Sequence, residues 1–385
     1  MAINLNTVLD QDAGRALVER ILVKEFLARV KFDGPLANNK AYVLSKALPG
    51  RQGQYMEFTR KNHIRRPETE ADSTLGTDPA GGVSLGVNKV LLPIEYHRDY
   101  GKIQTNAQDT SWINLEDWVK EDAMIAWKRR MHELVQNAFV MGRAAPGVYD
   151  SSGNITTAFD ATAAASPTLY GVSFSFDAAP HYYAGGATDF GTLTAAHTMT
   201  WADIRSARVR LGNSKAPKIS GNKGPGYMCV LSDAQWNDLL LDDDGGRLTA
   251  AMAGGLNAAI EGLVNHQIFK YAGVYFVIDD QPFTEAISGT ENARVNWGGI
   301  HSALMFGNEA YGFLPMSGKN AMRPGFKVQD ITLTGYEFTV GWRVPWNCRI
   351  VNPDWALVIK SGVSEAEPNN YDAASNTQTH GFDVS

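Results

Sequence analysis

The sequence has few residues of the kinds that carry chemistry or cross a membrane. It contains only two cysteines, Cys229 in the apolar run 227–231 and Cys348 beside Trp346. This usage predicts two buried thiols in a reducing compartment, and not a disulfide or a metal pair. No uninterrupted apolar run approaches the length of a membrane span, and residues 1–4 lack the positive start and apolar core of a signal peptide. We therefore expect a chain that is made in the cytoplasm and has no membrane segment.

Metal and phosphate motifs are missing as well. The eight histidines are scattered singly, without the H-x-x-x-H spacing of a metal site. Residues 242–246 (DDDGG) resemble the start of a calcium loop, but Ala253 stands where the closing Glu is needed. Gly221, Gly224 and Gly226 lack the Lys-Ser/Thr ending of a phosphate loop. The sequence predicts turns at both places, and no metal, cofactor or catalytic site.

One pattern typical of an enzyme is present. Residues 82–86 match the G-x-S-x-G motif of serine hydrolases around Ser84, and Asp and His residues follow in the required order. That motif needs a strand before the serine and a helix after it, whereas Ser84 lies inside an apolar run of period two that continues through Val87 and Val90. We interpret Ser84 as a strand residue and expect no enzyme. A serine hydrolase that uses Ser84 stays as an alternative.

Positive charge is slightly outnumbered. Thirty-five Lys and Arg against forty-one Asp and Glu give a net charge of −6, which argues against a protein whose main work is to grip phosphate backbones. A hydrophobic content of 44% in 385 residues is enough for a large core and two or three subdomains. Patterns of helices and of strands both occur, so the sequence predicts a mixed α+β fold.

Two strand-like runs flank a charged loop. Residues 54–59 and 83–96 favour strands, and the second run alternates apolar residues at period two. The loop between them is broken by Pro67, Gly76 and Pro79 and has almost nothing to bury. A hairpin with such a tip cannot form its own core. We expect that another subunit covers it, with these residues as candidate contacts between subunits: Arg65, Arg66, Glu68, Glu70 and Asp72.

A long helix follows the hairpin. Asn114 is a good N-cap, and Gly142 is expected to end the helix. The apolar positions occupy more than one stripe, which indicates a helix covered on two sides. Trp118 and Trp127 stand nine residues apart and therefore point to different sides. We expect both to be mostly buried, one against the β segment of its own subunit and the other under another part of the chain or a neighbouring subunit.

The centre of the chain has an α/β pattern. Thr200 with Asp203, and Ser232 with Gln235, form capping boxes before apolar helical stretches, and Gly212 is expected to stop the first helix. Short runs rich in β-formers predict strands at 227–231, 274–278 and 336–344.

Short phrases along nearly the whole chain carry a family resemblance: Leu48-Pro49-Gly50 to Gly53, Phe58-Thr59-Arg60, Tyr183-Ala184-Gly185-Gly186-Ala187-Thr188, Leu231-Ser232 to Asp238-Leu239, and Gly273-Val274 to Asp279-Asp280 and Pro282. Taken with the order of the parts, they resemble the major capsid proteins of tailed bacteriophages of the Hong Kong 97 type. The closest branch is the one typified by the N4-like podoviruses. The resemblance implies these segments: an N-terminal arm (1–50), an extended E-loop hairpin (51–106), a peripheral domain with a spine helix (107–143), an insertion or long loop system (144–199), an axial α/β domain (200–325), and a returning peripheral β segment with a polar tail (326–385).

The function implied by the resemblance is structural. Copies of the chain would self-assemble as hexamers and pentamers into an icosahedral shell around double-stranded phage DNA, which they contact loosely. The implied location is the virion, after synthesis in the host cytoplasm. Expected partners are a separate scaffolding protein, a portal and, where the shell has one, a cement protein. The alternative is an encapsulin-like nanocompartment shell protein, which shares the fold and encloses cargo protein.

Overall fold

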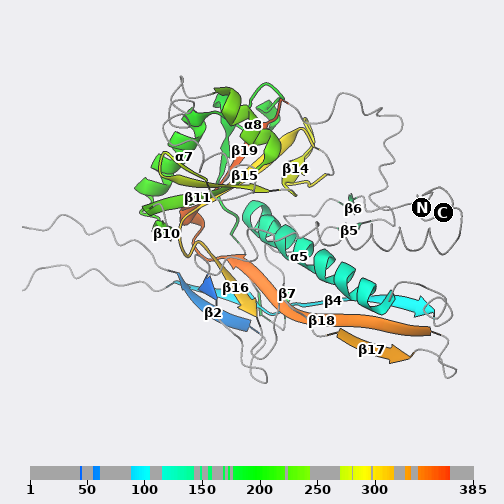
Figure 1. Cartoon of the computed structure of the whole chain (residues 1–385). Coiled ribbons are helices and arrows are strands. Elements are labelled where there is room, and N and C mark those ends of the chain that lie inside the picture. The colour runs from blue at the N-terminus through cyan, green and yellow to red at the C-terminus, as the bar shows by residue number, and fades with distance from the viewer. Residues whose placement is uncertain are drawn as a thin grey trace, which may run out of the picture.

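In the computed structural model of the chain, two large β-sheets are joined by one long helix (Figure 1). This arrangement confirms the mixed α+β class. Every structural statement below refers to the residues that the structure describes: 44–45, 55–60, 88–104, 115–142, 148–149, 155–157, 168–169, 172–173, 177–221, 224–242, 269–279, 281–295, 298–315, 326–330 and 337–364.

The larger sheet has eight strands, with these bounds: β9 His181–Tyr183, β10 Ile219–Gly221, β11 Gly224–Ser232, β12 Phe269–Tyr271, β13 Val274–Asp279, β14 Phe283–Glu285, β15 Ile300–Phe306 and β19 Ala356–Gly362. Their order is β12-β13-β11-β15-β19-β9, with β10 beside β11 and β14 beside β15. The strands predicted at 227–231 and 274–278 are confirmed, and they pair in parallel. Most of their residues are buried, which explains why they read as continuous apolar runs.

Helices cover both faces of the larger sheet. The α-helices of the described residues are α5 Leu115–Met141, α7 Trp201–Asn213 and α8 Asp233–Asp242. Trp201 and Trp236 bring α7 and α8 against the Phe276 ring, at centroid distances of 5.6 and 5.8 Å. Phe139 of α5 meets Phe306, at 5.4 Å. The strand register places Phe276 and Phe306 on opposite faces of the sheet. Helix α5 therefore packs on one face, and α7 and α8 pack on the other.

The predicted capping boxes are confirmed. The Thr200 side chain accepts from the Asp203 backbone N–H at the start of α7, and the Asp203 carboxylate accepts from the Thr200 N–H at 3.0 Å. At the start of α8, the Gln235 N–H donates to Ser232 Oγ at 3.2 Å, and the Ser232 N–H donates to Gln235 Oε1 at 3.2 Å. Each pair satisfies N–H groups that a helix start leaves without an intrahelical partner.

Two glycine predictions need correction. The helix α7 continues past Gly212 to Asn213, because Gly212 keeps a helical conformation and does not stop the turn. Gly221 and Gly224 are paired at the end of the β10–β11 hairpin, as expected of turn residues. Gly226, however, lies inside β11, where a Cβ atom would come within 2.8 Å of a backbone carbonyl. Gly226 therefore permits close approach of two backbones and is not a turn residue.

The smaller sheet has five strands: β1 Leu44–Ser45, β4 Tyr96–Gln104, β16 Tyr311–Pro315, β17 Phe326–Asp330 and β18 Glu337–Ile350. The order is β1-β16-β18-β17, and β4 pairs with the first part of β18. The strand predicted at 336–344 is confirmed as part of β18, the longest strand described. Figure 1 shows β18 and β4 running beneath the length of α5.

The hairpin predicted before the long helix is confirmed at its base. Strands β2 Tyr55–Arg60 and β3 Asn88–Pro93 pair antiparallel, with Tyr55 opposite Pro93 and Arg60 opposite Asn88. The next strand, β4, pairs with β18 and not with the hairpin. The range 51–106 therefore holds a strand of the smaller sheet in addition to the hairpin.

The end of the tract 144–199 belongs to the larger sheet. Strand β9 pairs in parallel with β19 at the sheet edge, so this part is not a free loop system. The earlier part contains two short hairpins, β5 Val148–Tyr149 with β6 Ile155–Thr157, and β7 Thr168–Leu169 with β8 Val172–Ser173.

The long helix predicted from Asn114 to Gly142 is confirmed as α5, which packs against both sheets. Gly142 ends it with φ of 83° and donates its N–H to the Ala138 carbonyl at 3.0 Å, a conformation that glycine adopts without a Cβ penalty. The C-terminal half of the helix is buried on all sides, while residues in the N-terminal half are partly exposed. Within the described residues, no helix is long and apolar enough to cross a membrane.

Candidate functional site

One face of the smaller sheet packs against α5. The rings of Trp127 and Trp342 lie 5.0 Å apart, and His97 of β4 lies 5.1 Å from Trp127. Gly101 of β4 is also required here, since a Cβ atom would come within 2.7 Å of Val119 on α5. Side chains alternate between the two faces of a strand, so the intervening residues of β4 and β18 point away from α5.

The hairpin base covers part of the opposite face. A separate apolar cluster joins β2 and β3 to the ends of β16 and β18: Phe58, Val90, Leu92, Ile94, Leu314 and Val351. Buried polar bonds fix the contact, because Asn347 Nδ2 donates to the Pro93 carbonyl at 2.8 Å and Arg349 donates to the Leu91 carbonyl. The base of the hairpin is therefore anchored on its own subunit.

The rest of that face is exposed, basic and aromatic. We call it the open sheet face, and it consists of Tyr96, Arg98, Tyr100 and Lys102 of β4, Lys327 of β17 and Arg343 of β18. The Arg343 guanidinium lies 4.0 Å from the centroid of the Tyr96 ring, an arrangement that stabilises a cation over an aromatic face. The sequence did not reveal this surface because three strands far apart in the chain supply it.

The predicted site residues have different outcomes. Arg65, Arg66, Glu68, Glu70, Asp72 and Ser84 lie outside the described residues, so their roles stay predictions. On α5, Trp127 is 1% exposed and packs on the smaller sheet, whereas Trp118 is 41% exposed. If Trp118 is mostly buried in the assembled protein, as predicted, the residues that cover it belong to another subunit or to segments outside the described residues. Both cysteines are free and buried, as predicted, and burial raises the pKa of Cys229 to about 12.

His132 is a buried, hydrogen-bonded core histidine. His132 of α5 donates to Asp279 at the end of β13, at 2.7 Å, and Gln136 donates to the same carboxylate oxygen at 2.7 Å. Burial alone would raise the pKa of Asp279, but His132 and the other donors lower it overall. This network fixes the spine helix to the larger sheet. Within the described residues, no group of His, Cys, Asp and Glu side chains is arranged to hold a metal ion.

A buried lysine organises a second polar cluster. The Lys360 side chain is 0% exposed, and its Nζ lies 3.0 Å from Glu285 Oε1, 3.2 Å from Glu291 Oε1 and 2.8 Å from Asn292 Oδ1. His181 also donates to Glu291, at 2.7 Å. The cluster ties the loop after β14 to β19 and β9. Burial raises the pKa of Glu285, although Lys360 opposes this effect.

Two histidines, the half-buried His97 and the buried His301, predict sensitivity to acid. Burial lowers the pKa of His97 and of His301 to about 4 in each case, whereas an unfolded histidine titrates near 6.5. Between these values the unfolded chain binds more protons, so stability should decrease as pH falls from about 6.5 to about 4. The full effect is about 3 kcal/mol per histidine at most.

Urea unfolding at pH 7.5, 5.5 and 4.5 measures this loss. His301→Gln is the matched variant, because His301 donates to the Gly298 carbonyl at 3.1 Å and accepts from Ser232 Oγ at 2.7 Å. Glutamine retains a donor and an acceptor and does not titrate, so the variant should lose part of the dependence on pH. Equal stability of the parent at all three values would contradict the prediction.

Comparison with known proteins gives matches at the level of structure. Neither a protein-family model nor a curated protein sequence matches this chain. The capsid of Ralstonia phage GP4 matches with a TM-score of 0.60 and 18% identity, over 85% of this chain and 89% of that chain. The capsid asymmetric unit of cyanophage Pam1 matches with a TM-score of 0.58 and 11% identity, over 87% of this chain and 93% of that chain. The chain therefore has the fold found in these two phage capsids.

Proposed function

We propose that the chain is the major capsid protein of a tailed bacteriophage, of the Hong Kong 97 type and its N4-like branch. In this proposal it self-assembles as hexamers and pentamers into an icosahedral shell around double-stranded DNA. The observation that carries the proposal is the fold shared with two phage capsids over most of both chains. The role is structural, without catalysis, and its place is the virion.

The hairpin and the open sheet face support assembly between copies. Among the described residues, the hairpin base packs on the ends of β16 and β18 in its own subunit, and the open sheet face is exposed. The hairpin tip carries acidic residues next to basic ones. We propose that the tip of a neighbouring copy lies on the open sheet face, with Glu68, Glu70 and Asp72 near its cations. Complementary charges of this kind set the register and reject wrong partners.

Other components act around this shell in the proposal. A separate scaffolding protein would guide assembly, a portal would occupy one vertex, and a cement protein would bind where the shell has one. The net charge of −6 fits loose contact with packaged DNA, because counterions neutralise most of the DNA charge.

Expression of the chain alone and with phage scaffolding protein tests the function. Negative-stain images and sedimentation should show closed shells. A monomer or small oligomer that hydrolyses esters through Ser84 would contradict the proposal, and shells that enclose cargo protein in place of DNA would favour an encapsulin-like compartment.

Charge reversal at the hairpin tip should impair assembly. Glu68→Lys with Glu70→Lys should leave the subunit folded, since surface charges contribute only about 0–1 kcal/mol to stability. The same change places cations against the cations of the open sheet face, and like charges at a docked site cost several kcal/mol. Circular dichroism reports the fold, and sedimentation reports the yield of shells. Glu365→Lys with Glu367→Lys in the polar tail is the control, and normal shells from the tip variant at physiological salt would count against the contact.

A further inference from the structure

A basic surface lies on α7 and the segment that follows it. Residues 204–232 carry six Lys or Arg and no Asp or Glu, in a chain of net charge −6. The members whose side chains the structure describes are exposed: Arg205, Arg208, Arg210, Lys215 and Lys218. Cations gathered on one surface of a chain that is acidic overall indicate a local site for an anion.

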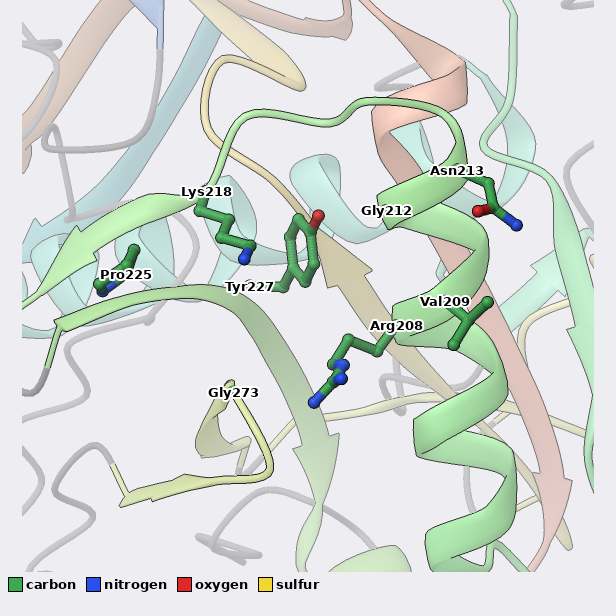
Figure 2. Close-up of a pocket in the computed structure, with 8 residues that line it drawn as sticks. All are labelled: Arg208, Val209, Gly212, Asn213, Lys218, Pro225, Tyr227 and Gly273. Atoms are coloured by element: carbon green, nitrogen blue, oxygen red, sulfur yellow. The ribbon is translucent and has the colours of Figure 1, made fainter.

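An open pocket of about 360 Å³ lies in this surface, and we call it the α7 pocket. Figure 2 shows Arg208 extending from α7 and Lys218 from the segment before β10, on either side of the Tyr227 ring. The remaining lining residues carry no carboxylate: Val209, Gly212, Asn213, Pro225 and Gly273. The volume lies at the lower end of the range for small-molecule sites. The pocket therefore has room for a small anionic group between two cations.

The cations at the α7 pocket are held in position. Arg208 donates to the Ala272 carbonyl, which fixes its guanidinium at the rim. The Tyr227 side chain between the two cations is 3% exposed and therefore rigid. Lys270 adds a third cation beside the rim, because its Nζ donates to the Pro225 carbonyl at 3.1 Å. Groups that are positioned before a ligand arrives lose little freedom when they bind it.

The two cations that line the pocket have no partner of opposite charge in the described part of the chain. A guanidinium has five N–H donors, and within that part Arg208 uses one of them, toward a neutral carbonyl. Lys218 makes no hydrogen bond or ion pair there. An anion bound between them would accept charge-assisted hydrogen bonds from both.

Phosphate is the anion that fits this surface. Arginine binds phosphate through a planar fork of donors, and lysine binds it as a point charge. The pocket supplies one of each. Positive charge also continues outside the pocket, at Arg210 and Lys215. A single carboxylate of a protein would neutralise the pocket alone, whereas DNA carries one negative charge per about 1.7 Å of its axis and would neutralise the flanking cations as well.

We propose that the α7 pocket binds a phosphate group between Arg208 and Lys218, and that packaged DNA supplies this phosphate. Such a contact positions a duplex without reading its base sequence. One phosphate contact per subunit is weak by itself, which agrees with loose contact between shell and DNA. The source of the phosphate rests on the proposed function, whereas the phosphate site rests on the geometry of the pocket.

Removal of the two pocket cations tests the site. Arg208→Gln with Lys218→Gln should weaken binding of the full chain to a double-stranded DNA oligonucleotide about tenfold, because charge-assisted hydrogen bonds are lost. The slope of log affinity against log salt concentration should also decrease by about 0.9, the value for one phosphate contact. Fluorescence anisotropy at several salt concentrations measures both quantities.

Arg210→Gln with Lys215→Gln is the matched control. It removes the same charge from the same part of the chain, but neither side chain lines the pocket. Cations outside the pocket act on DNA through an attraction that salt screens, so the control should weaken binding only about twofold. Circular dichroism and thermal unfolding check that every variant is folded.

Small probes distinguish the sources of the phosphate. Inorganic phosphate and deoxyadenosine monophosphate should compete with the labelled oligonucleotide, and deoxyadenosine, which lacks the phosphate, should not. If deoxyadenosine monophosphate binds the parent and not the pocket variant, while both bind the oligonucleotide equally, the pocket is a site for a free nucleotide. That result would keep the phosphate site and overturn DNA as its source.

The outcomes separate the phosphate site from the proposed function. Equal loss of DNA binding in the pocket variant and in the control would overturn the site, because the cations would then act only through net charge. If the pocket variant binds DNA and deoxyadenosine monophosphate like the parent but assembles poorly, the pocket takes an acidic segment of a protein and the phosphate site is wrong. Both results leave the capsid function standing when the parent forms shells. Phosphate binding in the pocket of a parent that forms no shells would keep the site and contradict the capsid function.

Discussion

Replacing Trp127 by alanine should destabilise the free subunit by about 3–5 kcal/mol. The indole is 1% exposed and lies between the spine helix and the smaller sheet. Its ring centroid is 5.0 Å from that of Trp342, 5.1 Å from that of His97 and 6.1 Å from that of Trp346. Removal leaves a cavity among rigid aromatic rings that cannot collapse to fill it. Urea unfolding of the unassembled subunit measures the change.

Trp118→Ala is the matched control on the same helix. Trp118 is 41% exposed in the single chain, so its truncation should cost the free subunit less than about 1 kcal/mol, as for most exposed positions. If a neighbouring subunit covers Trp118, the same variant should lower the denaturant concentration at which shells come apart. Equal destabilisation of the free subunit by both changes would contradict the assignment of Trp127 as the buried anchor. If Trp118→Ala has no effect on the stability of shells, a neighbouring subunit does not cover Trp118.

Local patterns allowed the elements of the fold to be predicted. The capping boxes at Thr200 and Ser232 were visible because capping depends on residues only three positions apart. Gly142 could be assigned as the end of the spine helix for the same reason, since the φ of 83° that it adopts favours glycine. The sequence also placed Trp118 and Trp127 on different sides of the helix, but it could not say which side its own sheet covers.

Pairing between distant strands could not be predicted. The apolar alternation before Tyr96 suggested one strand that returns from the hairpin tip, but the chain changes partner after Pro93 and then pairs with β18. Periodicity reports which residues share a face and not which strand lies alongside. For this reason the open sheet face, which combines Arg98, Lys327 and Arg343, was missed.

The basic stretch 204–232, which carries six Lys or Arg and no Asp or Glu, was missed for a different reason. These charges lie in one segment of the sequence, but the net charge of the whole chain, −6, does not show a local excess of Lys and Arg. The local absence of acids between residues 204 and 232 was the signal that could have revealed the surface. Histidine spacing could not predict the network around His132. Its partner Asp279 lies far away in the chain, and the fold brings the two side chains together.

Replacing Lys360 by methionine should cost about 3–5 kcal/mol, because removal of one partner of a buried ion pair leaves the other charge uncompensated. Lys360 and Glu285 are both 0% exposed, and their charged atoms lie 3.0 Å apart. Methionine keeps most of the aliphatic length of lysine, so the loss reports the charge more than the packing. Urea unfolding of the free subunit at pH 8 measures it.

The effect of pH separates this cause from a simple packing defect. Without Lys360, burial and the neighbouring Glu291 raise the pKa of Glu285, and the hydrogen bond from the Asn292 backbone N–H opposes them only in part. A group whose pKa is raised on folding contributes stability at low pH and loses it as pH rises through the folded value. The cost of Lys360→Met should therefore be smaller at pH 5 than at pH 8. Lys360→Met with Glu285→Gln should be more stable than the single variant at pH 8, since no uncompensated charge remains at these two positions. A cost that is independent of pH and unchanged in the double variant would mean that the Lys360 side chain stabilises the fold by packing alone.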